Sequence, residues 1–328
     1  MTKQDLKIVF FGTPEFAVAS LDALVQDGFN IAAVVTMPDK AAGRGQKISM
    51  SAVKQYALDH SLPVLQPARL KDEEFVAQLR AIDADLFIVI AFRMLPEVVW
   101  TMPRLGTFNL HGSLLPLYRG AAPINRAVMN GDTETGVTTF FLKHEIDTGD
   151  ILRRESLEIG PDENAGSVHD RLMALGAELT LDTVRHIIAG DLRPIPQDEL
   201  LHGIEPTPAP KIFKEDCRVD WHRPAAELHN FVRGLAPYPA AWTGLTLGGE
   251  NGTEETTVKI LATRRTDAAG TLSPGQLSLE GKKVMVGCGN GTALELAEVQ
   301  PAGKRAMAAA DWMRGLRPGE NSRSPWMI

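Results

Sequence analysis

The chain has 328 residues, 44% of them hydrophobic and 23% charged, which is ordinary for a globular protein and enough for two domains. Its longest unbroken apolar run, residues 86–92, has seven residues, which excludes a membrane-spanning helix there, so we expect no membrane partner. The net charge of −7 argues against indiscriminate nucleic-acid binding, and two cysteines, Cys217 and Cys288, are too few for a disulfide framework.

The first residues run directly into an apolar strand pattern without the layout of a signal peptide, so we expect a cytoplasmic protein. Short apolar runs then alternate with helical patterns, which predicts an α/β fold with a doubly wound, largely parallel, Rossmann-like sheet. The predicted strands are residues 7–11, 31–36, 86–91, 107–110 and 137–142. The predicted helices are residues 15–26, 50–60, 72–81, 123–130 and 167–189.

The turn after the first strand has the topology of a phosphate-binding loop, with Thr13 as the expected N-cap of the first helix. A G-x-G-x-x-G fingerprint is absent, so we do not expect a tightly held dinucleotide.

Five prolines between residues 192 and 210 indicate an extended connector. We therefore predict a catalytic domain over residues 1–190, a Pro-rich linker over 191–208 and a second domain over 209–328. A helix over 224–234 and strands over 242–247, 257–263, 283–286 and 293–299 predict a small, OB-like β-barrel there.

Charge differs between the two halves of the chain. From Ala209 onward, 15 Lys and Arg face 13 Asp and Glu, against 19 and 28 in the residues before it. The second domain is therefore slightly basic, which favours a polyanionic partner only weakly, since random drift of surface charge explains the difference as well.

The most informative residues follow apolar runs in the middle of the chain. Asn109 and His111 come after residues 106–108, and Asp147 comes after residues 136–142. An amide, an imidazole and a carboxylate suit acyl transfer, because one can stabilise an oxyanion while the others move or orient a proton. No Ser or Cys lies in a nucleophile elbow, so we expect direct transfer between two bound substrates. The absence of metal-ligand spacing predicts no metal.

Each of these residues also has an ordinary structural interpretation. Asp147 taken alone would cap the turn at Asp-Thr-Gly, and most of the eight histidines are expected to be structural or solvated. Arg44 and Lys47 lie in a basic, glycine-rich loop that is either a solvated surface loop or a flexible arm that contacts phosphates.

The ordered motifs of this stretch resemble those of the formyltransferases that use 10-formyltetrahydrofolate. That family carries Asn-x-His, Ser-Leu-Leu-Pro, Arg-Gly and Asp-x-Gly at this spacing, here Asn109 with His111, Ser113 to Pro116, Arg119 with Gly120, and Asp147 with Gly149. The second half is similar to the tRNA-binding barrel of the members that formylate methionyl-tRNA. It carries Lys211, Lys214, the run Arg218-Val-Asp-Trp221 and the run QPAGKRAM at residues 300–307.

The resemblance implies transfer of a formyl group from 10-formyltetrahydrofolate, as co-substrate, to the α-amine of methionyl initiator tRNA. It implies that Asn109, His111 and Asp147 are catalytic, and that a loop lines the folate site with Ser113, Leu114, Leu115 and Pro116. It implies that tRNA contacts come from Arg44, Lys47 and Lys211. We expect a monomer.

The chain departs from the family pattern at residues 91–96, where Arg93 occupies a position at which the family has glycine. The backbone of the folate pocket is therefore left out of the predicted site. Alternative functions are a sugar-nucleotide formyltransferase, a formyltetrahydrofolate hydrolase on the same scaffold, and a non-catalytic tRNA- or folate-binding protein. The QPAGKRAM run and the Gly-Arg-Gly loop favour the tRNA enzyme.

Overall fold

The structure is a computed structural model that describes residues 1–42, 47–201, 203, 205–249, 252–266, 271–316 and 326–328. The described chain divides into two compact units. Unit 1 comprises Met1–Gly120, Thr135–Leu157 and Asp170–Pro208, and unit 2 comprises Ala121–Glu134, Glu158–His169 and Ala209–Ile328. The two domains and the linker expected from the sequence, over residues 1–190, 191–208 and 209–328, stay predictions.

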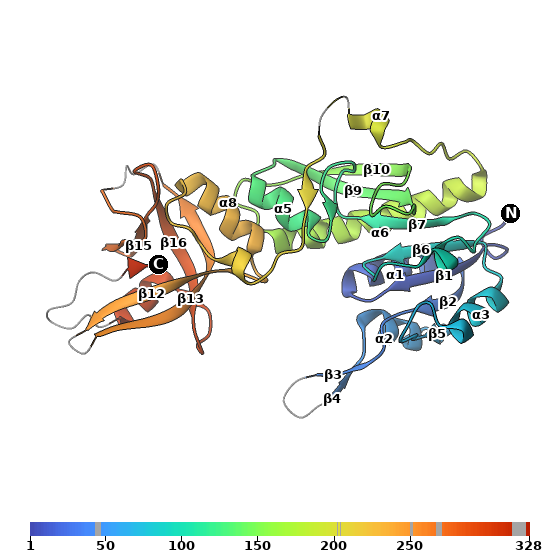
Figure 1. The fold of residues 1–328 in the computed structure, drawn as a ribbon, viewed down its shortest axis with the longest axis horizontal. Helices are drawn as coiled ribbons and strands as arrows, with labels where there is room; N and C mark the ends of the chain where they lie inside the picture. The colour runs from blue at the N-terminus through green and yellow to red at the C-terminus, as the bar shows by residue number, and fades with distance from the viewer. Residues whose placement is uncertain (43–46, 202, 204, 250–251, 267–270, 317–325) are drawn as a thin grey trace. The chain divides into compact units, whose positions relative to one another are not determined.

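Unit 1 is built on a seven-stranded sheet with the order β10-β9-β7-β6-β1-β2-β5 (Figure 1). The strands are β1 (Lys7–Gly12), β2 (Asn30–Val35), β5 (Val64–Leu65), β6 (Leu86–Ile90), β7 (Thr107–His111), β9 (Glu134–Phe141) and β10 (Ile151–Glu158). The pairs β1–β2, β1–β6, β2–β5 and β6–β7 are parallel, and β7–β9 is antiparallel. This confirms the predicted α/β fold with a largely parallel sheet.

The sheet reverses its direction of growth between β1 and β6. From β1 the chain adds β2 and β5 on one side, then returns to the other side to add β6 and β7. In open α/β sheets, ligands bind outside the carboxyl ends of the strands at such a switch point. Here those ends are Gly12 and Ile90, which are register partners.

Helices cover both faces of this sheet (Figure 1). Their bounds are α1 (Glu15–Gln26), α2 (Ala52–Asp59), α3 (Glu73–Ile82), α4 (Glu97–Trp100) and α6 (Ala165–Ala189). Phe75 and Leu79 of α3 and Val99 of α4 form one apolar cluster with Phe11 and Phe87 of the strands. On the other face, a Cβ added at Gly12 or Gly176 would meet Ala17 of α1 or Leu110 of β7, so α1 and α6 lie directly on the sheet.

Two local features differ from the expectations. Thr13 does not cap α1: the N-cap is Pro14, which makes no side-chain cap hydrogen bond, and no described residue pairs with the buried Thr13 hydroxyl. Strand β10 was not predicted, because only Ile151 and Leu152 at its start are buried and its later residues do not alternate.

Several short elements complete unit 1. The strands β3 (Lys40–Ala42) and β4 (Lys47–Ser49) pair in antiparallel fashion on either side of the predicted basic loop. Arg44 itself lies outside the described residues. The remaining bounds are β8 (Arg119–Gly120), α7 (Asp198–Leu201) and β11 (Pro208–Ala209).

Unit 2 is a curled antiparallel sheet with the order β14-β15-β16-β13-β12-β18, to which β17 adds beside β16. The strands are β12 (Ala241–Gly249), β13 (Gly252–Arg265), β14 (Leu277–Glu280), β15 (Lys283–Gly287), β16 (Ala293–Pro301), β17 (Met307–Ala308) and β18 (Trp326–Met327). The amide of Met327 donates to the carbonyl of Gly275, just before β14, at 2.8 Å. The sheet is thus a partly closed barrel, which agrees with the predicted small β domain.

The helix α8 (Ala225–Leu235) supplies much of the core of unit 2. Its Leu228, Val232 and Leu235 pack with Leu245, Val258, Ile260 and Leu296 of the sheet. The other helical elements are α5 (Pro123–Asn130), the 3-10 turn η1 (Glu215–Cys217) and α9 (Ala309–Gly315). Asn125 of α5 donates to the carbonyl of Gly234 at 2.8 Å. No helix in the described part of the chain is long and apolar enough to cross a membrane.

Candidate functional site

The strand β7 places Asn109 and His111 at its carboxyl end, two residues apart and therefore on one face of the sheet. Both lie inside the strand, rather than in a loop after it. The imidazole of His111 is buried with 7% of its residue surface exposed, and Asn109 is half-buried. Among the described residues, none forms a hydrogen bond with the side-chain amide of Asn109. That amide is available to a ligand.

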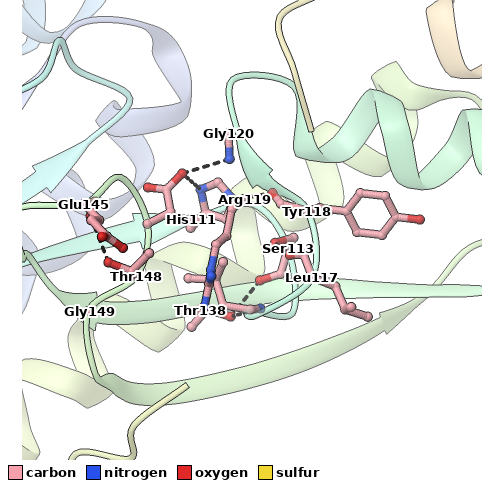
Figure 2. A network of polar contacts seen from close by, with 12 residues as sticks. His111, Ser113, Leu117, Tyr118, Arg119, Gly120, Thr138, Glu145, Thr148 and Gly149 are labelled. Carbon is pink, nitrogen blue, oxygen red and sulfur yellow. Dashed lines mark hydrogen bonds and ion pairs between the residues drawn. The ribbon is translucent and has the colours of Figure 1, made fainter. Parts of the chain in front are cut away.

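The contacts of His111 determine which of its ring nitrogens carries a hydrogen. Nε2 lies 2.9 Å from the carbonyl oxygen of Tyr118, and because a carbonyl only accepts, Nε2–H is the donor (Figure 2). Nδ1 faces Asp147 Oδ2 at 3.9 Å. Nδ1 is thus the one ring nitrogen free to accept a proton. When it carries that proton, the imidazolium lies beside a carboxylate.

Asp147 is held in a constrained turn after β9. Its φ of +56° lies in the left-handed region, where a residue other than glycine costs about 1–3 kcal/mol. The same oxygen that faces His111 accepts a hydrogen bond of 2.9 Å from the amide of Gly120 (Figure 2). Two residues later, a Cβ at Gly149 would lie 1.5 Å from the carbonyl oxygen of Phe141, so only glycine fits. The turn therefore aims one carboxylate oxygen at His111.

Gln197, in the Pro-rich segment, anchors this turn, although no motif in the sequence pointed to it. Its amide nitrogen donates to the carbonyls of Asp147 and Gly149 at 2.8 Å each. Its oxygen accepts from Nε and Nη2 of Arg119 at 3.0 and 2.7 Å. Gln197 is 3% exposed, so all of its hydrogen-bonding capacity is used inside unit 1. A glutamine in a segment with five prolines carries no sequence signal of this role.

The loop after β7 is held by its own hydrogen bonds. Ser113 is fully buried and donates to the carbonyl of Leu117 at 2.7 Å, while Thr138 donates to the Ser113 carbonyl at 2.6 Å (Figure 2). Leu115 is also fully buried, the bond from it to Pro116 is cis, and Leu114 is half-buried. Folate contacts of Ser113, Leu114, Leu115 and Pro116 stay a prediction. What the structure shows is a loop, held by these hydrogen bonds, that connects β7 to Tyr118 and Gly120.

A basic and aromatic surface lies on unit 2 near the start of its last segment. The ammonium of Lys211 lies 5.3 Å from the ring centroid of Phe213, which is 57% exposed. The cations of Lys214 and Arg218 lie 5.9 and 5.7 Å from the ring of Trp242. We call these five residues the Lys211 patch. Lys47, the other described tRNA candidate, begins β4 in unit 1.

No group of three or more His, Cys, Asp or Glu side chains in the described ranges is placed to hold a metal ion. His144 and Glu97 form an exposed ion pair at 3.2 Å.

Comparison with known proteins gives matches over both halves of the chain. The profile of the Formyl transferase family matches residues 6–184, and that of the Formyl transferase C-terminal domain matches residues 211–317. A methionyl-tRNA formyltransferase of Bacteroides fragilis is 53% identical over 316 residues, which cover 96% of this chain and 97% of that protein. One from Porphyromonas gingivalis is 48% identical over 320 residues, with 96% and 97% covered.

Solved structures with low sequence identity share the fold. An N-formyltransferase of Helicobacter canadensis, in complex with folinic acid and dTDP-3-aminofucose, has a TM-score of 0.62 at 18% identity. The match covers 90% of this chain and 99% of that one. HypX of Aquifex aeolicus in complex with tetrahydrofolic acid has a TM-score of 0.60 at 17% identity, covering 98% of this chain and 50% of that one.

Proposed function

This chain belongs to the formyltransferase family, and we propose that Asn109, His111 and Asp147 carry the transfer of a formyl group to the amine of methionyl initiator tRNA. The methionyl-tRNA formyltransferases match nearly the whole chain at about half identity, which supports that acceptor. The family uses a folate-type formyl donor, and 10-formyltetrahydrofolate is the donor that we propose.

The residues at the end of β7 suit the donor's formyl oxygen. The amide of Asn109 has no partner among the described residues, and His111 lies two residues further on the same face. Attack of the amine on the formyl carbon places negative charge on that oxygen, and preorganised donors stabilise such charge. The single observation that carries the proposal is this pairing of a free amide with a buried, oriented imidazole.

The tautomer of His111 restricts how it can take part. Because Nε2–H is committed to the Tyr118 carbonyl, His111 donates to the oxyanion only when Nδ1 is also protonated. Asp147 Oδ2, 3.9 Å from Nδ1, stabilises that cation. The carboxylate therefore keeps His111 protonated, or receives the amine proton itself; these are the two roles that we propose for Asp147.

The α-amine of the acceptor attacks the formyl carbon directly, and no covalent enzyme intermediate is needed. A free α-amine has a pKa of about 8, and the neighbouring ester lowers it, so a large part is neutral near pH 7.5. As the C–N bond to the amine forms and the bond from the formyl carbon to the folate nitrogen breaks, the amine loses a proton and the departing nitrogen gains one. Asp147 and His111 are the described groups positioned to handle that proton.

Contact with the tRNA is proposed for Arg44, Lys47 and Lys211. Lys211 is supported by its surroundings, because exposed cations over aromatic rings can bind phosphates while the rings accept stacked bases. We also propose that the protein acts as a cytoplasmic monomer. Light scattering of the purified chain would test the oligomeric state.

The experiment that tests the function combines purified protein with 10-formyltetrahydrofolate and methionyl initiator tRNA. We expect formyl-methionyl-tRNA with the charged tRNA and no product with uncharged tRNA. Formate release without tRNA would indicate a hydrolase. Formylation of an amino-sugar nucleotide, with no activity on methionyl-tRNA, would indicate a sugar formyltransferase.

A further inference from the structure

The segment after β6 starts beside the proposed catalytic residues. Ile90, the last residue of β6, is the register partner of Leu110, which precedes His111 on β7. Ile90 also pairs with Gly12 at the end of β1, so residues 91–96 leave the sheet at the switch point between β1 and β6. Ligands of open α/β sheets bind outside the strand ends at such a switch point, so a donor whose formyl carbon reaches Asn109 and His111 is expected beside this segment.

Arg93 ties this segment to a different part of unit 1. Nη1 donates to the carbonyl of Ala68 at 2.9 Å, and Nη2 donates to the carbonyl of Pro67. Both carbonyls belong to the connector between β5 and α3. Gln66 in that connector donates to the carbonyl of Met37 and to Asp39 at 2.9 and 2.8 Å. One guanidinium thus joins the ends of β6 and β5, and Gln66 extends the tie to the end of β2.

The neighbouring aromatic residue, Phe92, packs the same segment against β1. The guanidinium carbon of Arg93 lies 5.7 Å from the ring centroid of Phe92, and that ring lies 5.9 Å from the ring of Phe11 in β1. Leu95 is buried in the apolar cluster of α3 and α4. Ala91, at the start of the segment, has φ of +47°, a left-handed conformation that a residue other than glycine keeps only when its surroundings enforce it.

The charge of Arg93 is not matched by a carboxylate. No described acidic side chain lies within ion-pair distance of its guanidinium, and no described acceptor meets its buried Nε. Burial lowers the pKa of the guanidinium, which shows that the surroundings oppose a cation there. The Thr13 hydroxyl, just after the paired strand end at Gly12, is a second buried polar atom without a described partner. Both atoms are thus hydrogen-bonding positions that the described residues leave open.

We propose that Arg93 is a positioning residue that holds residues 91–96 in the conformation that binds the formyl donor, and so sets the affinity for that donor rather than the rate of transfer. The proposal rests on the proposed function of the same site. When only a fraction of a protein is in its binding-competent conformation, apparent affinity falls by that fraction. Removing the Arg93 side chain removes the two charge-assisted hydrogen bonds that keep the segment in place.

The test compares Arg93→Ala, Arg93→Lys and the wild type. For Arg93→Ala we expect the KM for 10-formyltetrahydrofolate to rise at least tenfold, while kcat and the KM for methionyl-tRNA stay within about twofold. Arg93→Lys keeps a cation but not the fork that reaches two carbonyls, so its KM should lie between the two. The matched control is Arg80→Ala, an exposed arginine on α3, which should behave as wild type.

Two further measurements separate a positioning role from a structural one. Isothermal titration with 5-formyltetrahydrofolate should show the same loss of affinity without any turnover, and amide hydrogen exchange at residues 66–69 and 91–96 should rise in Arg93→Ala. An unchanged donor KM and Kd in a folded variant would overturn the proposal. A lower kcat, a higher KM for both substrates and a lower melting temperature, all appearing together, would also overturn it. If Arg93→Ala does not fold, Arg93→Lys carries the comparison.

Failure of the proposed function would look different. In that case the wild type would not formylate methionyl-tRNA, yet its binding of 5-formyltetrahydrofolate could still be compared among the Arg93 variants.

Discussion

At the scale of single residues, the site depends on one ring nitrogen. The Tyr118 carbonyl occupies Nε2 of His111, which leaves Nδ1 facing Asp147. A neutral histidine in solution interconverts between two tautomers, and the Tyr118 carbonyl selects the one that carries its hydrogen on Nε2. The consequence is that His111 can only be an oxyanion donor as a cation, so the nearby carboxylate matters even if it never takes a proton.

His111→Ala should reduce kcat for formyl transfer by about 10²- to 10³-fold, the cost of removing one oxyanion donor. Circular dichroism should show a folded protein with a cooperative melt. The control is His144→Ala, since that imidazole is exposed and contacts Glu97 and the ring of Trp100 rather than the proposed catalytic residues. Turnover of His111→Ala close to the wild-type value would contradict the assignment.

At the scale of elements, the turn that carries Asp147 is anchored by a segment that supplies none of the three residues proposed to be catalytic. Gln197, from the Pro-rich segment after α6, donates to two carbonyls of the turn that carries Asp147. Ile195 in the same segment exchanges backbone hydrogen bonds of 2.9 and 2.8 Å with Ile151 at the start of β10. The part of the segment around Ile195 is therefore paired with the sheet of unit 1, whereas Asp198–Leu201 form the helix α7.

Gln197→Ala should lower kcat about 10- to 100-fold, because a turn misplaced by about 1 Å costs that much in a positioned site. Gln197→Glu should be as damaging, since a carboxylate keeps the contact with Arg119 but cannot donate to the two carbonyls. The exposed Gln55 of α2 provides the control variant Gln55→Ala. The measurement is kcat from steady-state kinetics with both substrates saturating. A wild-type kcat in both Gln197 variants would contradict the proposed anchoring of the Asp147 turn.

If the Lys211 patch contacts tRNA, variants in it should change the KM for methionyl-tRNA. Lys211→Ala should raise the KM for methionyl-tRNA and reduce the slope of log KM against log salt by about 0.7–0.9, the effect of one phosphate contact. Phe213→Ala should raise the same KM without changing the slope, because stacking is uncharged. Neither should alter the donor KM. Lys282→Ala, at an exposed position between β14 and β15, is the control, and a fall in donor affinity instead would contradict the proposed contact.

At the scale of the whole molecule, each unit buries its own apolar core. The core of unit 2 encloses both cysteines, which are each 1% exposed. Burial raises the pKa of Cys288 to about 12 and also raises the pKa of Cys217. Both thiols therefore stay protonated near neutral pH, and since the thiolate is the reactive form, they are inert while unit 2 is folded.

Alkylation of the native protein by iodoacetamide at pH 8 should consequently be slow for both cysteines and become fast in denaturant. In the native protein the rate should rise only as pH approaches the raised pKa of Cys288. Mass spectrometry of labelled peptides measures each site separately. Rapid labelling of Cys288 at pH 8 under native conditions would show that its surroundings open without global unfolding.

Local patterns were sufficient for much of the architecture. Short continuous apolar runs predicted β1, β2, β6, β7 and β9 to within a few residues. Strands buried inside a sheet that is covered on both faces are apolar on both of their own faces, which produces such runs. Helix periodicity did the same for α1 to α3 and for α8. The ordered motifs from Asn109 to Gly149 identified the family that the comparisons then showed.

Other features depend on contacts between residues far apart in the chain, which no local pattern contains. Strand β10 is paired by its neighbours rather than by its own alternation, and Thr13 lost its expected capping role because its hydroxyl is turned into the interior. The tautomer of His111 and the anchoring by Gln197 exist only once the chain has folded. Composition and periodicity determine which segments form strands and helices, since burial there acts residue by residue. Only tertiary packing decides where single hydrogen bonds go, because each needs two partners brought together by the whole fold.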